Sequence, residues 1–406
     1  MGRTRELRRL VRLVEMTETG HAVPGLMRAA VLVDVGRFEL RDVPVQPPGP
    51  HEVVVRVRAV GLCGTDLHIV HGHANYNNDA RGIARPLATH PQILGHEIAG
   101  EIADLGSEVH DARVGDCVVV DQGRTCVSEY RDPVCEYCRT GDSHQCEYYA
   151  EHGITGLPGG FAEYVTVPAA NTVRVDGNLA PDLAALAEPL GCIVHSSEMI
   201  SRAHARYPLG RRGEEHGVRS ILVCGGGPAG LLFVQYLRNV LRFDGLLLLA
   251  EPNARKRALA EQFGAETIDP SSVDLVDAVA ERTRGRRIEL LIEATGSGAL
   301  FASIHGLIRK QATVVLYGHG HSGVQLGVLN QLQFLEPALV SPAGASGGHT
   351  DDRRPLTYGH ALRLLEEERV DVASLITHRY ASLASVPDAF MGDHHLPDYV
   401  KGVVVL

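Results

Sequence analysis

The sequence lacks the features of a membrane-spanning or nucleic-acid-binding protein. Its most apolar stretch, Leu246–Ala250, is far shorter than the roughly 20 residues that a transmembrane helix needs. A basic excess is also missing, because 49 Asp and Glu residues outnumber 39 Lys and Arg residues and leave a net charge of −10. Phosphate neutralisation needs a basic face, so this charge argues against a nucleic-acid partner. The composition, with 44% hydrophobic and 22% charged residues, is that of an ordinary globular protein.

An export signal and an internal repeat are absent as well. The first 26 residues contain no continuous apolar core, which a signal peptide requires. They do contain apolar residues at helical spacing: Leu7, Leu10, Val11 and Val14. We interpret this segment as an extension before a domain that begins near Met27, and an amphipathic helix docked on a partner or membrane is the alternative. The chain has eight cysteines, and we therefore expect a cytoplasmic protein whose clustered cysteines are metal ligands rather than disulfides.

The 406 residues are enough for two domains of different character. From Met27 the chain is rich in Gly, Pro and Cys, and Val53–Val57 alternates as a half-buried strand does. After Ala180, apolar strands alternate with helical stretches such as Ala254–Phe263, which predicts an α/β fold with an open parallel sheet. The strands expected there are Ile221–Cys224, Leu246–Ala250, Leu290–Glu293, Thr313–Tyr317 and Leu335–Val340.

The chain also returns to its first domain. Ser341–Asp352 is rich in Gly, Ser and Pro and has the composition of a crossing between domains. We therefore expect an extension at 1–26, a first domain made of 27–192 and 342–406, and a second domain at 193–341.

A glycine-rich turn follows the first strand of the second domain. Gly225, Gly227 and Gly230 match G-x-G-x-x-G, with Pro228 and Ala229 between them. These glycines permit a tight turn, close approach of the pyrophosphate, and close packing of helix on strand.

The next apolar strand ends at Glu251, where a carboxylate can bind the adenosine ribose diol. This favours NAD as the cofactor. Arg255 and Lys256 could instead contact the 2′-phosphate of NADP, although Glu251 would repel that phosphate.

Two groups of residues have zinc-ligand chemistry. Cys63 opens the motif Cys-Gly-Thr-Asp-Leu-His, and His96-Glu97 follows farther along the chain. Thiolate, imidazole and carboxylate all bind zinc, and a catalytic zinc keeps one position open to act as a Lewis acid. Glu188, in Glu-Pro-Leu, could add a further carboxylate.

The second group is a cysteine lobe, typical of a structural zinc site. It contains Cys135, Cys138 and Cys146 and needs a fourth ligand. Asp132 continues the two-residue gap and is the expected ligand, while Cys126 is the softer alternative. A lobe without metal is the remaining possibility.

Together these motifs resemble the zinc-containing medium-chain dehydrogenase/reductase family, over nearly all of 27–406. They also include Gly159-Gly-Phe-Ala-Glu-Tyr164 and Glu293-Ala-Thr-Gly296. Within the family, Cys-Gly-Thr-Asp-x-His is similar to the threonine and polyol dehydrogenases, and Glu-Pro-Leu to the polyol and glucose dehydrogenases. The resemblance implies a GroES-like β domain around an inserted Rossmann domain.

The resemblance also implies roles for individual residues. Cys63, His96 and Glu97 become catalytic zinc ligands, with Glu188 as an exchangeable or water-mediated one. Thr65 and His68 become a proton relay that accepts the hydroxyl proton of the substrate and passes it to solvent. Thr295, in the Glu-Ala-Thr-Gly motif, joins the cofactor-binding residues.

Two departures from the family pattern stand out. Asp132 replaces the first cysteine of the lobe. The stretch between His68 and His96 is longer than in typical relatives, includes Asn75-Tyr-Asn-Asn-Asp79, and is expected to reshape the mouth of the substrate site.

The leading hypothesis is a zinc-dependent, NAD-linked oxidation of a secondary alcohol in a polyol, sugar, cyclitol or amino alcohol. A second is an NADPH-dependent carbonyl reductase. A third is a non-catalytic binding protein on the same scaffold, which the presence of all three primary ligand types disfavours. We expect a homodimer or homotetramer, because relatives join sheets at the edge where Thr313–Tyr317 and Leu335–Val340 lie.

Overall fold

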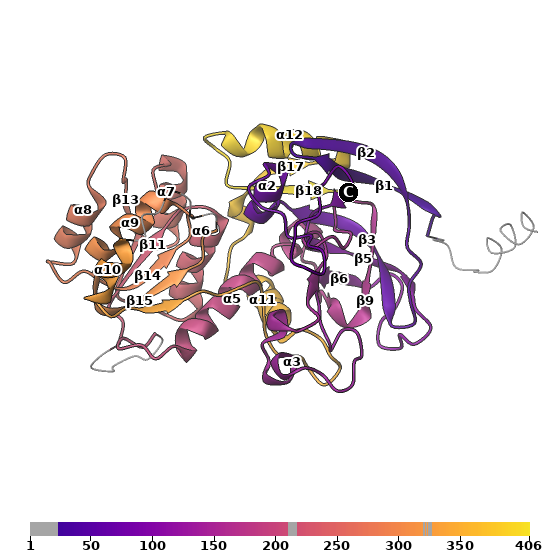
Figure 1. Ribbon diagram of the computed structural model, residues 1–406, viewed down its shortest axis with the longest axis horizontal. Coiled ribbons are helices and arrows are strands. Elements are labelled where there is room, and N and C mark those ends of the chain that lie inside the picture. The colour runs from indigo at the N-terminus through magenta and orange to yellow at the C-terminus, as the bar shows by residue number, and fades with distance from the viewer. Residues whose placement is uncertain (1–22, 210–216, 320, 322, 324–326) are drawn as a thin grey trace, which may run out of the picture.

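The computed structural model describes residues 23–209, 217–319, 321, 323 and 327–406. Figure 1 shows a β-rich body on the right, which contains both the N-terminal strands and the C-terminal ones, and an α/β body on the left. The interpretation of 1–26 falls almost entirely outside the described residues. Within them, no helix is long and apolar enough to cross a membrane.

The β-rich body is built from short strands. Its strands are β1 (Leu26–Asp34), β2 (Arg37–Pro44), β3 (Glu52–Gly61), β4 (Gln92–Ile93), β5 (Glu97–Leu105), β6 (Cys117–Val120), β7 (Gly123–Arg124), β8 (Ala150–Glu151), β9 (Tyr164–Pro168), β10 (Thr172–Arg174), β17 (Ile376–Tyr380) and β18 (Lys401–Val405). Its helices are α2 (Gly64–Val70), α3 (Glu136–Thr140), α4 (Pro181–Ala184), α11 (Leu356–Glu366) and α12 (Val386–Met391).

Strands β1, β2 and β4 form one sheet, and a second sheet joins β3 to the C-terminal strands. Its order is β10-β6-β5-β3-β18-β17, with β9 also paired to β3. The C-terminal strand β18 runs antiparallel to β3, with Val403 opposite Gly61. The last residues of the chain therefore lie beside the loop that follows β3, where Cys63 stands.

The α/β body contains a parallel sheet covered by helices. Its strands are β11 (Ser220–Cys224), β12 (Leu246–Ala250), β13 (Glu266–Ile268), β14 (Ile288–Glu293), β15 (Ile308–Leu316) and β16 (Ala338–Val340). Its helices are α6 (Pro228–Gln235), α7 (Ala254–Gln262), α8 (Leu275–Arg282), α9 (Gly298–Leu307) and α10 (Val328–Gln333).

The strand order of this body is β13-β12-β11-β14-β15-β16, and every pair is parallel. Numbered along the chain this is 3-2-1-4-5-6, the doubly wound order, in which ligands bind at the carboxyl ends of the strands where the order reverses. That point lies between β11 and β14. The expected α/β fold with a Rossmann sheet is confirmed.

Two details differ from the sequence-based expectations. The division expected between residues 192 and 193 falls inside helix α5 (Ala187–Arg202), so a continuous helix leads from one body toward the other. The last strand begins at Ala338 rather than Leu335, because Glu336 adopts a left-handed backbone with φ 49° and ends the turn after α10.

Candidate catalytic site

The three expected primary zinc ligands lie together in the β-rich body. Cys63, His96 and Glu97 each offer one ligand atom, and these atoms all lie within 4.8 Å of one another. Cys63 is the N-cap of α2, and Glu97 begins β5, where it pairs with Gly61. This strand pairing places Cys63 beside His96 and Glu97, although more than thirty residues separate them in the chain.

A buried carboxylate holds these ligands in place. Asp66 is fully buried, and its Oδ2 accepts a hydrogen bond from the backbone N–H of Cys63 at 3.1 Å. Its Oδ1 accepts one from Gly95 N–H at 3.3 Å and lies 3.4 Å from Nδ1 of His96. Metal-bound histidines commonly have such an outer carboxylate, which orients the ring. Sequence reasoning missed this role, although Asp66 stands inside the motif.

Glu97 has a partner that its sequence neighbourhood does not reveal. Nζ of Lys401 lies 2.5 Å from Oε1 of Glu97 and also donates to the carbonyl of Leu62. Both charged side chains are buried. The ion pair joins residues 304 positions apart, which no local motif could predict.

The other carboxylate oxygen of Glu97 is free for a ligand. Oε2 is buried and has no hydrogen-bond partner among the residues that the structure describes. A Cβ atom at residue 61 would lie 1.8 Å from this oxygen, so only glycine leaves room for it. A carboxylate with one unpartnered oxygen, grouped with a thiol and an imidazole, fits the requirements of a zinc ion.

Glu188, on the first turn of α5, lies near the primary ligands but outside their compact group. Its Oε1 accepts hydrogen bonds from Gln122 at 3.1 Å and from the Cys192 thiol at 3.3 Å. Burial raises the pKa of Glu188 to about 7, while His96 opposes this rise and Glu97 adds to it. The structure therefore leaves Glu188 outside the group formed by Cys63, His96 and Glu97.

The expected proton-relay residues share helix α2. Thr65 lies in its first turn and His68 three residues later, a spacing that places both on one face. The His68 ring lies 5.6 Å from that of His319, which belongs to the α/β body. Burial lowers the pKa of His68, with further lowering from His319 and His73. His68 is therefore a neutral imidazole near neutral pH.

The glycine turn has the geometry of a pyrophosphate-binding loop. Gly225 follows β11 with φ +104°, and Gly227 caps helix α6. A Cβ at residue 230 would lie 1.9 Å from the carbonyl oxygen of Gly225, so the third glycine permits the close packing of helix and strand. Pro228 and Ala229 open the helix, whose N-terminus favours an anion.

Glu251 stands beside this turn. It is buried, and its Oε2 accepts a hydrogen bond from Gly226 N–H at 2.7 Å. Arg255 is exposed, and its backbone N–H bonds to the side chain of Asn253. A different arginine, Arg257, donates to the carbonyl of Glu251. The carboxylate expected at the ribose thus lies at the turn.

Thr295 follows β14 and lies opposite the glycine turn, which follows the neighbouring strand β11. A Cβ at residue 225 would lie 3.0 Å from Cγ2 of Thr295. The buried carboxylate of Glu293 accepts hydrogen bonds from the backbone N–H and the hydroxyl of Thr295. Its other oxygen lies 2.7 Å from Nε2 of His321. Glu293 therefore shapes the loop at the end of β14.

The fourth member of the cysteine lobe is Cys126, not Asp132. Cys126, Cys135, Cys138 and Cys146 form one buried group whose ligand atoms lie within 4.8 Å of one another. Asp132 is exposed and outside this group. The expectation that Asp132 completes the set was therefore wrong.

A tight turn explains this correction. The backbone N–H of Arg131 donates to the carbonyl of Cys126 at 2.9 Å, and Ser128 and Thr125 bond to each other inside the turn. The chain doubles back and brings Cys126 Sγ to 3.5 Å from Cys146 Sγ. Residue spacing alone cannot show this fold-back.

The pKa of one lobe thiol is lowered, whereas burial raises the pKa of Cys126 and Cys138. Burial opposes ionisation of Cys135, but backbone hydrogen bonds at Cys138 and Glu147 outweigh it and lower the pKa of Cys135 to about 6. Four thiols without a disulfide, one of them readily ionised, form a suitable structural zinc site.

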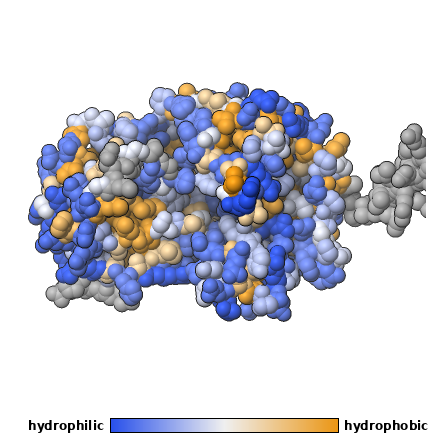
Figure 2. Space-filling model, in the orientation of Figure 1, coloured by the Kyte–Doolittle hydropathy of each residue, from blue (hydrophilic) through white to orange (hydrophobic). Residues whose placement is uncertain are grey.

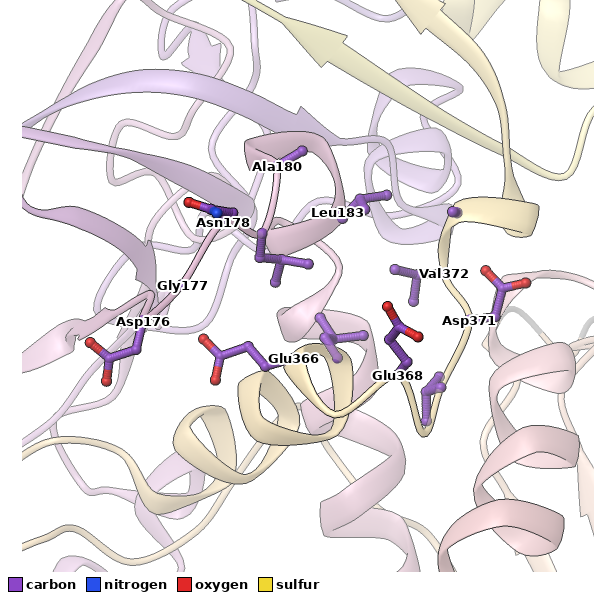
Figure 3. Close-up of a pocket in the computed structure, with 13 residues that line it drawn as sticks. Asp176, Gly177, Asn178, Ala180, Leu183, Glu366, Glu368, Asp371 and Val372 are labelled. Atoms are coloured by element: carbon purple, nitrogen blue, oxygen red, sulfur yellow. The ribbon is translucent and has the colours of Figure 1, made fainter.

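A separate cavity of about 660 Å³ lies away from these groups, between α4 and the end of α11. Figure 3 shows acidic side chains around it: Asp176, Glu366, Glu368 and Asp371. Carboxylates repel the phosphates of a dinucleotide, so this cavity does not suit the cofactor.

Comparisons with known proteins agree with the site. Residues 49–177 match the alcohol dehydrogenase GroES-like domain, and residues 228–356 match the zinc-binding dehydrogenase model. The chain is 30% identical over 353 residues to L-threonine 3-dehydrogenase of Pyrococcus furiosus, an alignment covering 87% of this chain and 90% of that enzyme. It is 29% identical over 371 residues to L-galactonate-5-dehydrogenase of Escherichia coli, covering 90% and 95%.

A solved structure shows the same architecture. It is a zinc-binding dehydrogenase from Sinorhizobium meliloti bound to NADP, with a TM-score of 0.75 and 27% identity over 94% of this chain and all of that one. Together with the two ligand groups and the doubly wound sheet, these likenesses have one explanation. The chain belongs to the zinc-dependent medium-chain dehydrogenase/reductase family, whose members are nicotinamide-dependent oxidoreductases acting on CH–OH groups.

Proposed function

We propose that this protein oxidises a secondary alcohol of a polyol-like substrate with NAD, using zinc at Cys63, His96 and Glu97. The observation that carries the proposal is the compact group of these three ligands. The group adjoins helix α2, whose His68 ring lies 5.6 Å from that of His319, just after the Rossmann strand β15. Tyr317, which follows β15, is close enough for the charges of Cys63 and Glu188 to affect its pKa, which burial raises. The ligand group and the cofactor crevice therefore meet at one place.

We assign the residues of this site separate roles in metal binding, ligand orientation and proton transfer. Zinc, when bound, supplies a Lewis acid for the alcohol oxygen. Asp66 orients His96, and the pair of Lys401 with Glu97 restrains one carboxylate oxygen while the other has no hydrogen-bond partner among the described residues. Thr65 accepts the hydroxyl proton of the substrate by hydrogen bond, and the neutral ring of His68 carries it toward solvent.

For the cofactor we propose NAD rather than NADP. The buried carboxylate of Glu251 lies at the glycine turn, where it would accept hydrogen bonds from a ribose diol and repel a 2′-phosphate. The exposed Arg255 is the feature that favours the second candidate, an NADPH-dependent carbonyl reductase.

We also propose a homodimer joined at the edge of the Rossmann sheet. Strand β16 pairs with β15 and ends the sheet among the described residues. Beside it are exposed apolar side chains: Leu329, Phe334 and Leu339. Figure 2 shows an apolar area on this body, where Figure 1 places α10 and β15. A second copy would cover both the edge and the apolar side chains.

The test combines metal analysis with kinetics. Purified protein should contain zinc and reduce NAD with members of a panel of polyols, sugars, cyclitols and amino alcohols. The kcat/KM for NAD should exceed that for NADP, and Glu251→Ala should narrow the difference. Activity only in the reductive direction with NADPH would favour the second candidate, and inactivity of the zinc-loaded protein with every compound would refute the proposal.

A further inference from the structure

The long stretch between His68 and His96 contains Tyr76, which lies at the boundary between the two bodies. The hydroxyl of Tyr76 lies 2.6 Å from Nε2 of His319, so the side chains are hydrogen bonded. Tyr76 belongs to the β-rich body, and His319 follows β15 of the Rossmann sheet. The contact therefore spans the boundary between the ligand group and the cofactor crevice.

The loop around Tyr76 is built to hold its position. Asn75 donates to the carbonyl of Arg85 at 2.7 Å, and the N–H of Arg85 donates to the carbonyl of Asn77 at 2.8 Å. Asn77 is buried and packs against Gly156, where a Cβ would lie 2.7 Å from it. These contacts hold the residues on both sides of Tyr76.

On the other body, the backbone of His319 packs against a neighbouring loop, while the residue as a whole is exposed. A Cβ at residue 296 would lie 2.0 Å from the carbonyl oxygen of His319, so the loop after β14 lies directly on this backbone. The His319 ring meets that of His68 edge to face at 5.6 Å. Burial raises the pKa of the Tyr76 hydroxyl, and the charges of Glu151 and Cys63 raise it further.

We propose that Tyr76, positioned by His319, is a specificity-determining residue that binds a second hydroxyl group of the substrate, next to the carbon being oxidised. This inference rests on the proposed function, and it narrows the substrate to vicinal diols and polyols. The partner of Tyr76, His319, comes from the body that holds the glycine turn, and its ring meets that of His68 on the helix that begins after Cys63.

The chemistry of the pair selects a hydroxyl group. If Tyr76 donates to His319, its oxygen still accepts a hydrogen bond, and if His319 donates, the tyrosine hydroxyl still donates one. A hydroxyl group satisfies either arrangement because it both donates and accepts, whereas a carboxylate only accepts. An alcohol with a single hydroxyl group leaves this hydrogen bond of Tyr76 unmade. A site that binds a second hydroxyl group therefore discriminates against the analogue that lacks it.

The test compares 2,3-butanediol with 2-butanol, which differ by one hydroxyl group. Wild-type enzyme should have the higher kcat/KM for the diol. Tyr76→Phe removes only the hydroxyl and should lower kcat/KM for the diol about tenfold while changing that for 2-butanol less than twofold. Tyr148→Phe, which alters an exposed tyrosine of the cysteine lobe, should change neither value.

A binding measurement provides a readout without turnover. Calorimetry of the NADH-bound protein, where the alcohols cannot react, should show about tenfold weaker binding of the diol to Tyr76→Phe and unchanged binding of 2-butanol. Equal losses for both alcohols, or no loss for the diol, would overturn the inference. Wild-type oxidation without preference for the diol would overturn it as well and leave the proposed function intact, whereas inactivity toward the whole polyol panel would remove the proposed function itself.

Discussion

Individual side chains at the site have roles that follow from where their charges are buried. Asp66, Glu97 and Lys401 are all almost fully shielded from water, yet each has a charged or hydrogen-bonding partner. A buried charge without such a partner would cost several kcal/mol. These three side chains therefore stabilise one another. Replacing one of them should weaken metal binding, while the Rossmann body should stay folded.

Cys63→Ala should remove the catalytic zinc and lower turnover by about a hundredfold or more, because a Lewis acid supplies several kcal/mol of transition-state stabilisation. NADH should still bind, since the glycine turn lies on the other body. Zinc per subunit, NADH fluorescence and steady-state kinetics measure these effects. Cys117→Ala, at an exposed thiol, is the control, and full activity of Cys63→Ala would contradict the ligand assignment.

A second prediction at this scale concerns pH. Burial lowers the pKa of His152 to about 4, so the folded protein resists protonating a ring that the unfolded chain protonates below about 6.5. The stability linked to this residue is complete above pH 6.5 and is lost as the pH falls toward 4, by roughly 3 kcal/mol in total.

His152→Gln should therefore flatten the pH dependence of unfolding in this window. Urea unfolding at pH 6.5, 5.5 and 4.5 measures the slope, which should fall by about 1.4 kcal/mol per pH unit relative to wild type. His90→Gln, at an exposed histidine, controls for the loss of an imidazole. Coincident slopes for His152→Gln and wild type would show that the buried ring does not titrate as described.

At the scale of elements, a turn of the chain, rather than the two-residue spacing of the motif, determines the fourth member of the cysteine lobe. The ligands Cys135 and Cys138 flank the first turn of α3, and Cys146 follows a short helical turn. Cys126 joins them because the turn at 125–131 reverses the chain. The lobe holds little else that is apolar, so a metal would contribute much of its local stability.

Cys126→Ala should lose the second zinc and lower the melting temperature by several degrees, because a structural zinc contributes directly to folding. Asp132→Ala should keep both zinc ions and the wild-type melting temperature. Metal analysis and thermal unfolding distinguish the two variants. One zinc per subunit in the wild type would mean that the lobe holds no metal.

At the scale of the whole molecule, the two bodies meet where their chemistry is needed. The β-rich body supplies the ligand group, the Rossmann sheet supplies the glycine turn, and the bond between Tyr76 and His319 joins them at the site. The opposite edge of this arrangement, strand β16, faces outward with its apolar neighbours.

Leu339→Glu should convert a dimer into a monomer, because a buried unpaired charge at the shared edge would oppose association by several kcal/mol. Sedimentation velocity at micromolar concentration measures the mass. Leu26→Glu, at an exposed leucine of the other body, should leave the dimer intact. A wild-type protein that sediments as a monomer would refute the proposed interface.

The sequence by itself determined the features that depend on residues close together in the chain. The turn at Gly225–Gly230 and the parallel strands around it follow from local backbone freedom and from apolar runs, which is why both could be predicted. Cys63, His96 and Glu97 were likewise recognisable, since each stands in a short motif beside a strand end.

Tertiary structure alone decided the rest. Cys126 displaced Asp132 because a turn brought a distant thiol closer than a nearby carboxylate. Lys401 reached Glu97 because the last strand pairs with β3, and Tyr76 met His319 because two bodies close on each other. These pairings arise from packing and strand register between remote segments, and the spacing of residues along the chain carries no information about them.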